Sequence, residues 1–147
     1  MAFRPGLMIA MLGALLAAPV ASAQTSADPT GVWQTQAGDA RVRVARCGGM
    51  LCGTVVSLRD KIDPATGRAP VDNKNPDPSK GNRPIVGLQL FGDMRQVGEA
   101  RWNGHIYNAD DGGTYVSNLT LVNADALRVE GCVGAICGGE IWSRVGR

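Results

Sequence analysis

Apolar and polar residues alternate at every second position through much of this chain, and this pattern limits its fold more than any other feature. Between Ala40 and Arg46, Val42 and Val44 share one face while arginines occupy the other. Side chains two residues apart lie on the same face of a strand, so the pattern predicts half-buried strands. Helix-favouring runs are almost absent after the N-terminal segment. We therefore expect an all-β chain.

Glycine-rich and Asn/Asp-rich turns divide the chain into about eight predicted strands. The strands are expected at residues 31–35, 40–46, 51–58, 85–91, 100–108, 114–122, 127–130 and 139–145. A small antiparallel barrel suits this number, because closure removes the exposed edges of an open sheet. A sandwich of two sheets is the competing architecture, and the number of strands does not exclude it.

The N-terminal residues have the three-part layout of a secretory signal peptide. Arg4 supplies the positive start, Leu7 to Ala18 an apolar stretch, and Ala21-Ser22-Ala23 the small residues at a cleavage site. A membrane anchor is the alternative, but a spanning helix needs about 20 apolar residues, and this stretch is shorter. We expect a signal peptide over 1–23, a flexible leader over 24–30, one domain over 31–147, and a periplasmic or secreted location.

The net charge gives little basis for binding nucleic acid or an anionic membrane. The formal charge is +2, and it falls by one when Arg4 is removed with the signal peptide. A small net charge creates no basic field that would recruit such partners. No segment after the signal is apolar enough to span a bilayer. The sequence therefore predicts neither a nucleic-acid partner nor a membrane span, and it leaves the oligomeric state open.

Four cysteines form two pairs with the same spacing, Cys47 with Cys52 and Cys132 with Cys137. An even number of cysteines in an exported chain predicts disulfides. Each pair flanks a turn-like segment, and cysteines on opposite arms of a hairpin can reach the Cβ separation of about 4 Å that a disulfide needs. We expect the two local bridges. Bridges between the pairs are the alternative, as is a zinc site, although zinc pairs are usually spaced more tightly.

The segment from Arg59 to Pro84 differs from the rest of the chain. It contains five of the eight prolines, many Asn and Asp residues, and no apolar periodicity. Proline lacks a backbone donor and fixes φ, so this segment is not expected to pair as a strand. It is predicted to be a long, ordered surface loop. Connections of more than about 15 residues are usually functional or disordered, which makes the loop a candidate ligand-facing region.

Within this loop, four Asn and Asp side chains are candidate ligand-binding groups. They are Asp72, Asn73, Asn75 and Asp77. Their oxygens can coordinate a hard cation such as calcium or bind a polar ligand, but they can equally cap turns of their own backbone. The spacing matches no calcium-loop pattern. Arg83 is expected to pin the loop through a charge-assisted hydrogen bond to one of the carboxylates.

Most of the aromatic surface comes from Trp33, Trp102, Tyr107, Tyr115 and Trp142. In a small barrel, aromatic side chains can line the mouth of a cavity and stack on an apolar ligand. More often they fill the core, because eight strands leave room only for side chains or one small ligand. Trp102, Tyr107 and Tyr115 are the candidate ligand contacts.

No catalytic set is predicted, and neither a cofactor nor a metal is expected. His105 is the sole histidine, and no serine lies in a Gly-x-Ser-x-Gly elbow. The acidic residues are expected in turns and at outward-facing strand positions, not on opposite sides of a cleft. They are chiefly Glu99, Asp110, Asp111, Glu130 and Glu140. A hydrolase or isomerase that uses His105 or the loop carboxylates is the alternative.

An ordered set of short motifs resembles DUF2147, a family of small exported bacterial proteins. The motifs are Gly31-Val32-Trp33, Leu51-Cys52-Gly53, Asp72-x-x-Asn75-Pro76-Asp77-Pro78, Pro84-x-x-Gly87, Trp102-x-Gly104-x-Ile106-Tyr107, Gly113-Thr114-Tyr115 and Trp142-Ser143-Arg144. The resemblance implies a compact β-barrel similar to the calycins, which are the lipocalins and fatty-acid-binding proteins, and a periplasmic setting. It supplies no catalytic residues.

These observations favour a module that binds a small apolar or amphipathic ligand, or one that presents its long loop to an envelope protein partner. The reasons are the expected barrel, the concentration of aromatic residues and the lack of a catalytic set. A purely structural or protein-interaction domain is the third hypothesis.

Overall fold

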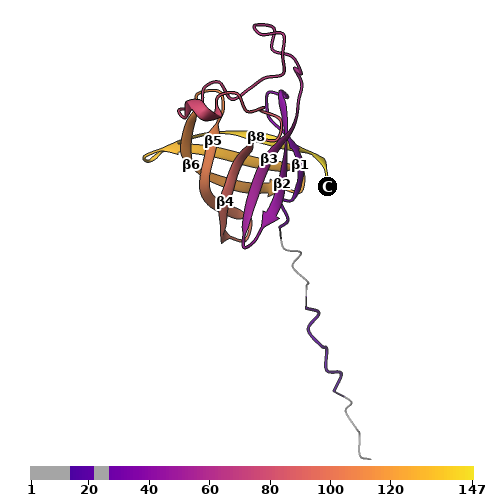
Figure 1. Ribbon diagram of the computed structural model, residues 1–147. Coiled ribbons are helices and arrows are strands. Elements are labelled where there is room, and N and C mark those ends of the chain that lie inside the picture. Colours follow the sequence, from indigo (N-terminus) through magenta and orange to yellow (C-terminus); the bar gives the residue numbers. More distant parts are fainter. Residues whose placement is uncertain (1–13, 22–26) are drawn as a thin grey trace, which may run out of the picture.

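The structure, a computed structural model, describes residues 14–21 and 27–147 (Figure 1). Most of the predicted signal peptide, its cleavage point and the first part of the leader therefore lie outside the described residues. Within the described ranges, no helix is long and apolar enough to cross a membrane.

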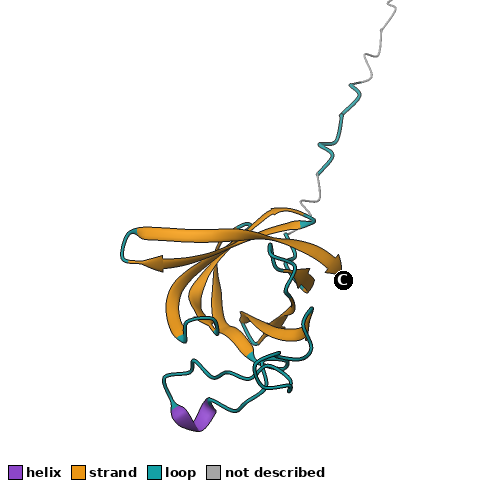
Figure 2. Cartoon of the chain, turned by 90° about the horizontal axis from the view of Figure 1, so that it is seen from above, coloured by secondary structure: helices purple, strands orange, loops and turns teal. Residues whose placement is uncertain are grey.

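Eight antiparallel strands close into a barrel in which each strand pairs with the next along the chain and β1 pairs with β8 (Figure 2). The strands are β1 Gly31–Gln34, β2 Ala40–Cys47, β3 Met50–Leu58, β4 Gln89–Gly98, β5 Arg101–Asn108, β6 Gly113–Asn123, β7 Ala126–Val133 and β8 Ile136–Gly146. The predicted all-β barrel is confirmed, and a sandwich is excluded. The long loop joins β3 to β4 and contains a short 3-10 helix, η1, over Pro78–Lys80.

The strands connect alternately at two ends of the barrel, because every strand is antiparallel to its neighbours. The end with the β2–β3, β4–β5 and β6–β7 turns is called the closed end. The opposite end is called the open end, and it has the β1–β2 turn, the long β3–β4 loop, the β5–β6 turn and the β7–β8 turn. The tip of the β7–β8 hairpin extends beyond the ring of strands in both views (Figures 1 and 2).

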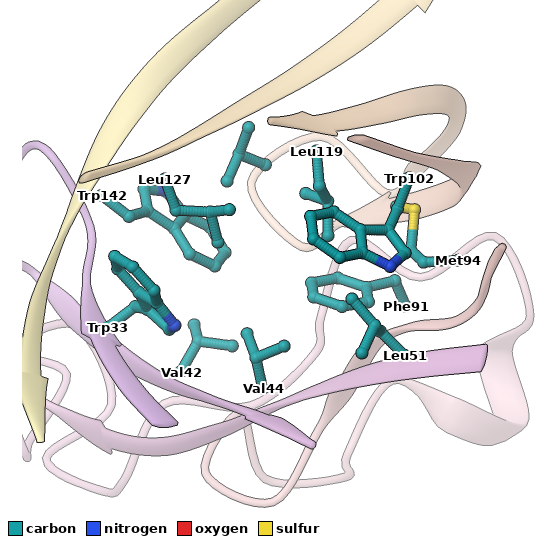
Figure 3. Close-up of a cluster of buried hydrophobic side chains, with 11 residues drawn as sticks. Trp33, Val42, Val44, Leu51, Phe91, Met94, Trp102, Leu119, Leu127 and Trp142 are labelled. Atoms are coloured by element: carbon teal, nitrogen blue, oxygen red, sulfur yellow. The ribbon is translucent and has the colours of Figure 1, made fainter. Parts of the chain in front are cut away.

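The core follows from the strand register, since residues directly opposite each other on paired strands point to the same side of the sheet. Trp33 lies opposite Val42, and Leu127 lies opposite Trp142. Eleven buried apolar side chains form the core (Figure 3): Trp33, Val42, Val44, Leu51, Phe91, Met94, Trp102, Leu119, Leu127, Val129 and Trp142. All three tryptophans are therefore core residues, and Trp102 is 2% exposed.

The closed end is sealed by residues just before β1. The indole nitrogen of Trp33 donates to the carbonyl oxygen of Pro29 over 2.8 Å. The guanidinium of Arg144 lies 4.3 Å from the centre of the Trp33 ring and donates to the backbone carbonyls of Asp28 and Thr30. These contacts hold the described part of the leader against the barrel.

The start of β4 differs from the predicted strand over residues 85–91. The strand begins only at Gln89, and Val86 is 49% exposed. Gly87 has φ of 94°, and the backbone N–H of Leu88 donates to the carbonyl of Ile85, so these residues form a turn. A positive φ suits glycine and interrupts the extended conformation. Apolar residues at every second position continue through this turn, which explains the error.

Each disulfide joins the two strands of a single hairpin. The bridge between Cys47 and Cys52 lies at the β2–β3 tip, where their Cα atoms are 5.9 Å apart. The bridge between Cys132 and Cys137 lies at the β7–β8 tip, and there the Cα atoms are 4.0 Å apart. The bridges thus stabilise two hairpins at opposite ends of the barrel.

Candidate ligand cavity at the open end

A cavity of about 740 Å³ lies at the open end of the barrel. Side chains from the β1–β2 turn, the β5–β6 turn and the β7–β8 hairpin surround it, together with Leu58 and Ile85 at the two ends of the long loop. Val129 and Trp142 belong both to the core and to the cavity lining, so they form its floor. The core therefore fills the closed end, and the remaining interior is open.

Small residues occupy one row of inward positions beside the cavity. Gly104 on β5 lies opposite Ser117 on β6, Ser117 lies opposite Gly131 on β7, and Gly131 lies opposite Gly138 on β8. This small-residue row is next to the core, because Ser117 is two residues from buried Leu119 and shares its face. Gly131 and Gly138 line the cavity, whereas a Cβ atom at Gly104 would lie 2.6 Å from the Asp93 side chain, so Gly104 allows the close packing of β4.

The space in front of Gly138 is open, and Gly138 itself is exposed near the tip of the β7–β8 hairpin. A Cβ atom added at Gly138 would meet no other atom within 4 Å. At Gly131, an added Cβ would only reach normal contact distance from the Tyr115 side chain, at 3.5 Å. The wall of the cavity therefore carries no side chain at Gly131 and at the exposed Gly138.

The walls of the cavity, between its floor and the open end, are mainly apolar. Val55, Leu58, Ile85, Leu90 and Ile106 line them. Binding sites for small molecules in proteins typically combine such apolar walls with a few placed polar groups. Apolar walls around an open volume of this size suit the hydrocarbon part of a ligand.

The polar groups around the cavity are predominantly acidic. Five acidic residues line it, and they are called the acidic rim: Asp39, Asp110, Asp111, Glu130 and Glu140. Glu130 follows the inward-facing Val129 on β7, so its side chain lies on the outer face at the edge of the cavity. Asp110 and Asp111 lie in the β5–β6 turn, as expected. Glu140 was expected to face outward, but it lies opposite Val129 and therefore points to the interior. Its Oε1 accepts a hydrogen bond of 2.5 Å from the indole nitrogen of Trp142.

Of the three predicted aromatic ligand contacts, Tyr115 lines the cavity and Trp102 lies in the core. Tyr107 is at the edge of the cavity, but its side chain shares the outer face of β5 with His105 and bonds Asp72. The Tyr115 hydroxyl donates to Oδ2 of Asp111 over 2.6 Å. This hydrogen bond raises the pKa of Tyr115 and lowers the pKa of Asp111. Asp111 therefore carries its charge at neutral pH beside the cavity.

The long loop is fastened to the barrel through Asp72, which is completely buried. Its carboxylate accepts hydrogen bonds from the Tyr107 hydroxyl at 2.6 Å, from Arg83 Nε at 2.8 Å and from Asn75 Nδ2 at 2.9 Å. Burial alone would raise the pKa of Asp72, but these three donors outweigh it and lower the pKa. Burial and the bond to Asp72 raise the pKa of Tyr107.

The other predicted loop residues bond within the loop. Asp77 caps η1 by accepting from the backbone and hydroxyl of Ser79, and Asn75 Oδ1 accepts from the backbone N–H of Asp77. The Asn73 N–H donates to the carbonyl of Val71. The loop candidates Asp72, Asn73, Asn75, Asp77 and Arg83 do not contact the cavity. Across the described ranges, no three His, Cys, Asp or Glu side chains are grouped so that they can hold a metal ion.

The loop also fixes the edge of the cavity. Gly112 has φ of 74°, and a Cβ atom there would overlap the carbonyl group of Lys74. Glycine at this position therefore lets the loop pack directly on the β5–β6 turn. Since residues of that turn line the cavity, the anchored loop holds the mouth in shape.

His105 lies on the outer face of β5, next in sequence to Gly104 of the small-residue row. Its Nδ1 is 2.7 Å from Asp93 Oδ2, and its backbone N–H donates to Asp93 Oδ1 over 2.8 Å. The hydrogen bond from the His105 ring is the main cause that lowers the pKa of Asp93. The His105 side chain is 59% exposed and points away from the cavity.

Comparison with known proteins places this barrel in a family. Residues 31–144 match the family model described as "Uncharacterized protein conserved in bacteria (DUF2147)". The chain belongs to the DUF2147 family. No curated protein matches it.

Among solved structures, the chain is similar to protein HP1028 from Helicobacter pylori, which is described as belonging to the lipocalin family. The TM-score is 0.66 at 24% sequence identity, over 80% of this chain and 83% of that chain. The two proteins therefore share the fold. This DUF2147 barrel has a lipocalin-like fold, as the resemblance implied.

The small-residue row and the inward position of Glu140 were not identified from the sequence, although a signal for both was present. Gly104 is two residues from Trp102, and Glu140 is two residues from Trp142. Continuing the alternation from these buried tryptophans places both residues on the inner face. The cavity itself depends on how neighbouring strands are aligned, which alternation along one strand does not specify.

Proposed function

We propose that this DUF2147 protein is exported and binds a small apolar or amphipathic molecule in the cavity at the open end. The small-residue row above a filled core is the observation that carries the proposal. An eight-stranded barrel has room for side chains or for one small ligand. Here the side chains fill one end, and small residues lie beside the open cavity at the other.

The size and walls of the cavity support a ligand of modest size. Ligand sites are typically about 300–1,000 Å³, and the volume of about 740 Å³ falls within this range. The apolar walls favour a hydrocarbon part, and the acidic rim favours a polar part at the mouth. The hydrogen bonds of Asp72 to Tyr107 and Arg83 support a preformed site, because groups of the protein itself hold the loop. A preformed site avoids the entropic cost of ordering a loop on binding.

Export is supported by the predicted signal peptide and by the two disulfides. Disulfides persist in oxidising compartments such as the bacterial periplasm. Both hairpin bridges are in place in the folded barrel. The periplasm is therefore the compartment in which we expect the protein to meet its ligand.

The exposed tip of the β7–β8 hairpin favours a second candidate function, the binding of an envelope protein. Val133 is 70% exposed and Ile136 is 80% exposed, and both also line the cavity mouth. An exposed apolar pair of this kind is typical of a contact surface. A partner bound there would cover the cavity entrance.

Native mass spectrometry of protein purified from the periplasm tests the proposed function. We expect a mass that corresponds to the chain from residue 24 onward with two disulfides, plus a bound small molecule that is lost on denaturation. A titration with decyl maltoside, followed by tryptophan fluorescence, tests binding independently because Trp142 lies on the cavity floor. Native protein without any small-molecule adduct, together with a fluorescence signal that never saturates, would contradict ligand binding.

A further inference from the structure

The charges around the cavity specify the ligand more closely. All five charged residues that line it are acidic, and the described part of the chain places no lysine, arginine or histidine in the lining. The whole protein, in contrast, has a formal net charge of +2. The negative field at the open end is therefore local, and a cavity lined by one sign of charge concentrates ligands of the other sign.

Glu140 is the half-buried acidic residue next to the apolar floor of the cavity. It shares the inward face with Val129 and Trp142. One of its oxygens accepts the Trp142 indole N–H, and no basic group in the described ranges lies within ion-pair distance of the carboxylate. A carboxylate against apolar surface is costly unless a cation or further donors satisfy it. A ligand cation would supply this missing partner.

Two basic side chains lie near the acidic rim, and within the described residues neither forms an ion pair with it. Arg128 lines a separate surface hollow together with Glu130 and Glu140. Arg59 donates to the backbone carbonyl of Ala37 over 3.4 Å and is 3.5 Å from its own neighbour Asp60. The arginine of the long loop, Arg83, is paired with buried Asp72. A carboxylate or sulfate ligand would therefore find no cationic partner in the cavity.

A second observation lies inside the small-residue row. The Ser117 side-chain oxygen is completely buried and, within the described residues, is the one buried side-chain polar atom that has no hydrogen-bond partner. Ser117 lies opposite Gly131, which lines the cavity, and both face the interior. A buried hydroxyl without a partner usually indicates a missing ligand atom or ordered water. A hydrogen-bonding group of the ligand could satisfy it.

The distribution of the carboxylates favours an organic cation over a metal ion. The acidic rim is spread over the β1–β2 turn, the β5–β6 turn, β7 and β8. Three such groups do not converge on one point anywhere in residues 14–21 and 27–147. A metal ion needs several oxygen ligands at about 2–2.6 Å, whereas an ammonium group with attached hydrocarbon can use a spread negative field. The aromatic rings of Trp142 and Tyr115 can also contact such a cation.

We propose that the cavity selects organic cations with an apolar part, such as aliphatic amines or quaternary ammonium amphiphiles, with Glu140 as the main counter-charge. This inference rests on the proposed function, because it assumes that the cavity binds a ligand. It goes further by assigning the charge of that ligand and the residue that recognises it.

Calorimetric titration of three probes with the same decyl chain tests this inference. The probes are decyltrimethylammonium, decyl maltoside and decanoate, each below its micelle-forming concentration and at low ionic strength. We expect decyltrimethylammonium to bind at least about tenfold more tightly than decanoate, since electrostatic complementarity discriminates by charge. The preference should weaken in high salt because screening is stronger there.

A matched pair of variants assigns the effect to Glu140. Glu140→Gln removes the charge but keeps an oxygen for the Trp142 indole, and Glu99→Gln removes one charge from the exposed β4–β5 turn at the closed end. We expect Glu140→Gln to weaken decyltrimethylammonium about five- to tenfold and to leave decyl maltoside unchanged, because the variant removes the counter-charge that only the cationic probe uses. Glu99→Gln should change neither affinity.

Two results separate the inference from the proposed function. If decanoate binds as tightly as decyltrimethylammonium, or if Glu140→Gln changes both cationic and neutral probes equally, the charge preference is wrong while ligand binding stands. If none of the three probes binds to the wild-type protein, the proposed function fails and the inference fails with it.

Discussion

The hydroxyl of Tyr107 on β5 donates a hydrogen bond of 2.6 Å to the buried carboxylate of Asp72, which lies 35 residues earlier in the long loop. Arg83 and Asn75 also donate hydrogen bonds to this carboxylate. A segment that is rich in proline and lacks apolar periodicity is thus fixed by one buried charge. The shape of the cavity mouth depends on this anchor, because the loop packs against the β5–β6 turn.

Removal of the Tyr107 hydroxyl is expected to destabilise the protein. Tyr107→Phe should lower the free energy of unfolding by about 1–3 kcal/mol, since a hydrogen bond to a buried charged group is lost. Denaturant unfolding measures the change. The matched control is Tyr115→Phe, whose hydroxyl bonds the exposed Asp111, and it should have a smaller effect. Equal losses in the two variants would contradict a special role for the Asp72 anchor.

Stability should depend on acid pH partly through Asp72. The pKa of its carboxyl in the folded protein is lowered from the ordinary value of 3.8, so its contribution is fully present above that value. The contribution is lost as pH falls through the lowered pKa, because the unfolded chain then binds the proton more readily. Asp72→Asn should flatten the dependence of the unfolding free energy on pH between about 5 and 2.

Asp77→Asn is the control for this pH dependence. The pKa of Asp77 is also lowered, chiefly by its hydrogen bonds to Ser79, but its side chain is exposed at the start of η1. We expect a pH profile close to that of the wild type. A profile of Asp72→Asn that equals the wild-type profile would show that the buried carboxylate contributes nothing to acid sensitivity.

Filling the small-residue row should block the cavity. Gly138→Leu places a large side chain where an added Cβ atom meets nothing within 4 Å, so the barrel should remain folded. We expect at least a tenfold loss of affinity for decyl maltoside, because the leucine occupies the volume of the ligand. Calorimetric titration measures the affinity, and circular dichroism checks the fold.

Gly49→Leu is the matched control for the blocked cavity. Gly49 also has open space around it and no positive φ, but it lies in the β2–β3 turn at the closed end. This variant should bind decyl maltoside like the wild type. Undiminished binding by Gly138→Leu would place the ligand outside the small-residue row.

His105→Ala should leave ligand affinity within about twofold of the wild type, a difference that is small on the free-energy scale of binding. The His105 ring pairs with Asp93 on the outer face and does not contact the cavity lining. The same calorimetric titration measures this. A large loss of binding in a variant that remains folded would indicate that the ligand binds on the outer face of β5 and not in the cavity.

The disulfides should stabilise the hairpin tips without determining the fold. Replacing Cys132 and Cys137 together by serine is expected to lower the free energy of unfolding by about 2 kcal/mol, because the closed loop is short. Thermal unfolding of the oxidised variant against the wild type measures the loss. Complete unfolding of this variant at room temperature would be inconsistent with a barrel whose core lies at the closed end.

Part of this structure was predictable from local pattern. Alternation identified the inward faces of β2 and β7, and the spacing of the cysteines led to the two hairpin bridges that the barrel contains. These features depend on residues that are close in sequence. The hydrophobic pattern predicts them because strand and hairpin geometry is local.

Other features were not predictable because they depend on contacts between distant segments. Asp72 meets Tyr107 only once the loop has folded back on β5. The small-residue row requires the register of β5 through β8, which sets Gly104, Ser117, Gly131 and Gly138 side by side. Strand register is a property of the closed barrel, and one strand's composition does not determine it.

The most direct test of the account is a titration of isotope-labelled protein with decyltrimethylammonium, followed by backbone amide chemical shifts. We predict saturable shifts at the amides of Tyr115, Gly131 and Gly138 around the cavity, with Gly49 and Glu99 at the closed end unchanged. Shifts that are spread over the whole surface, that concentrate at the closed end, or that do not saturate would contradict a ligand site inside the open end of this barrel.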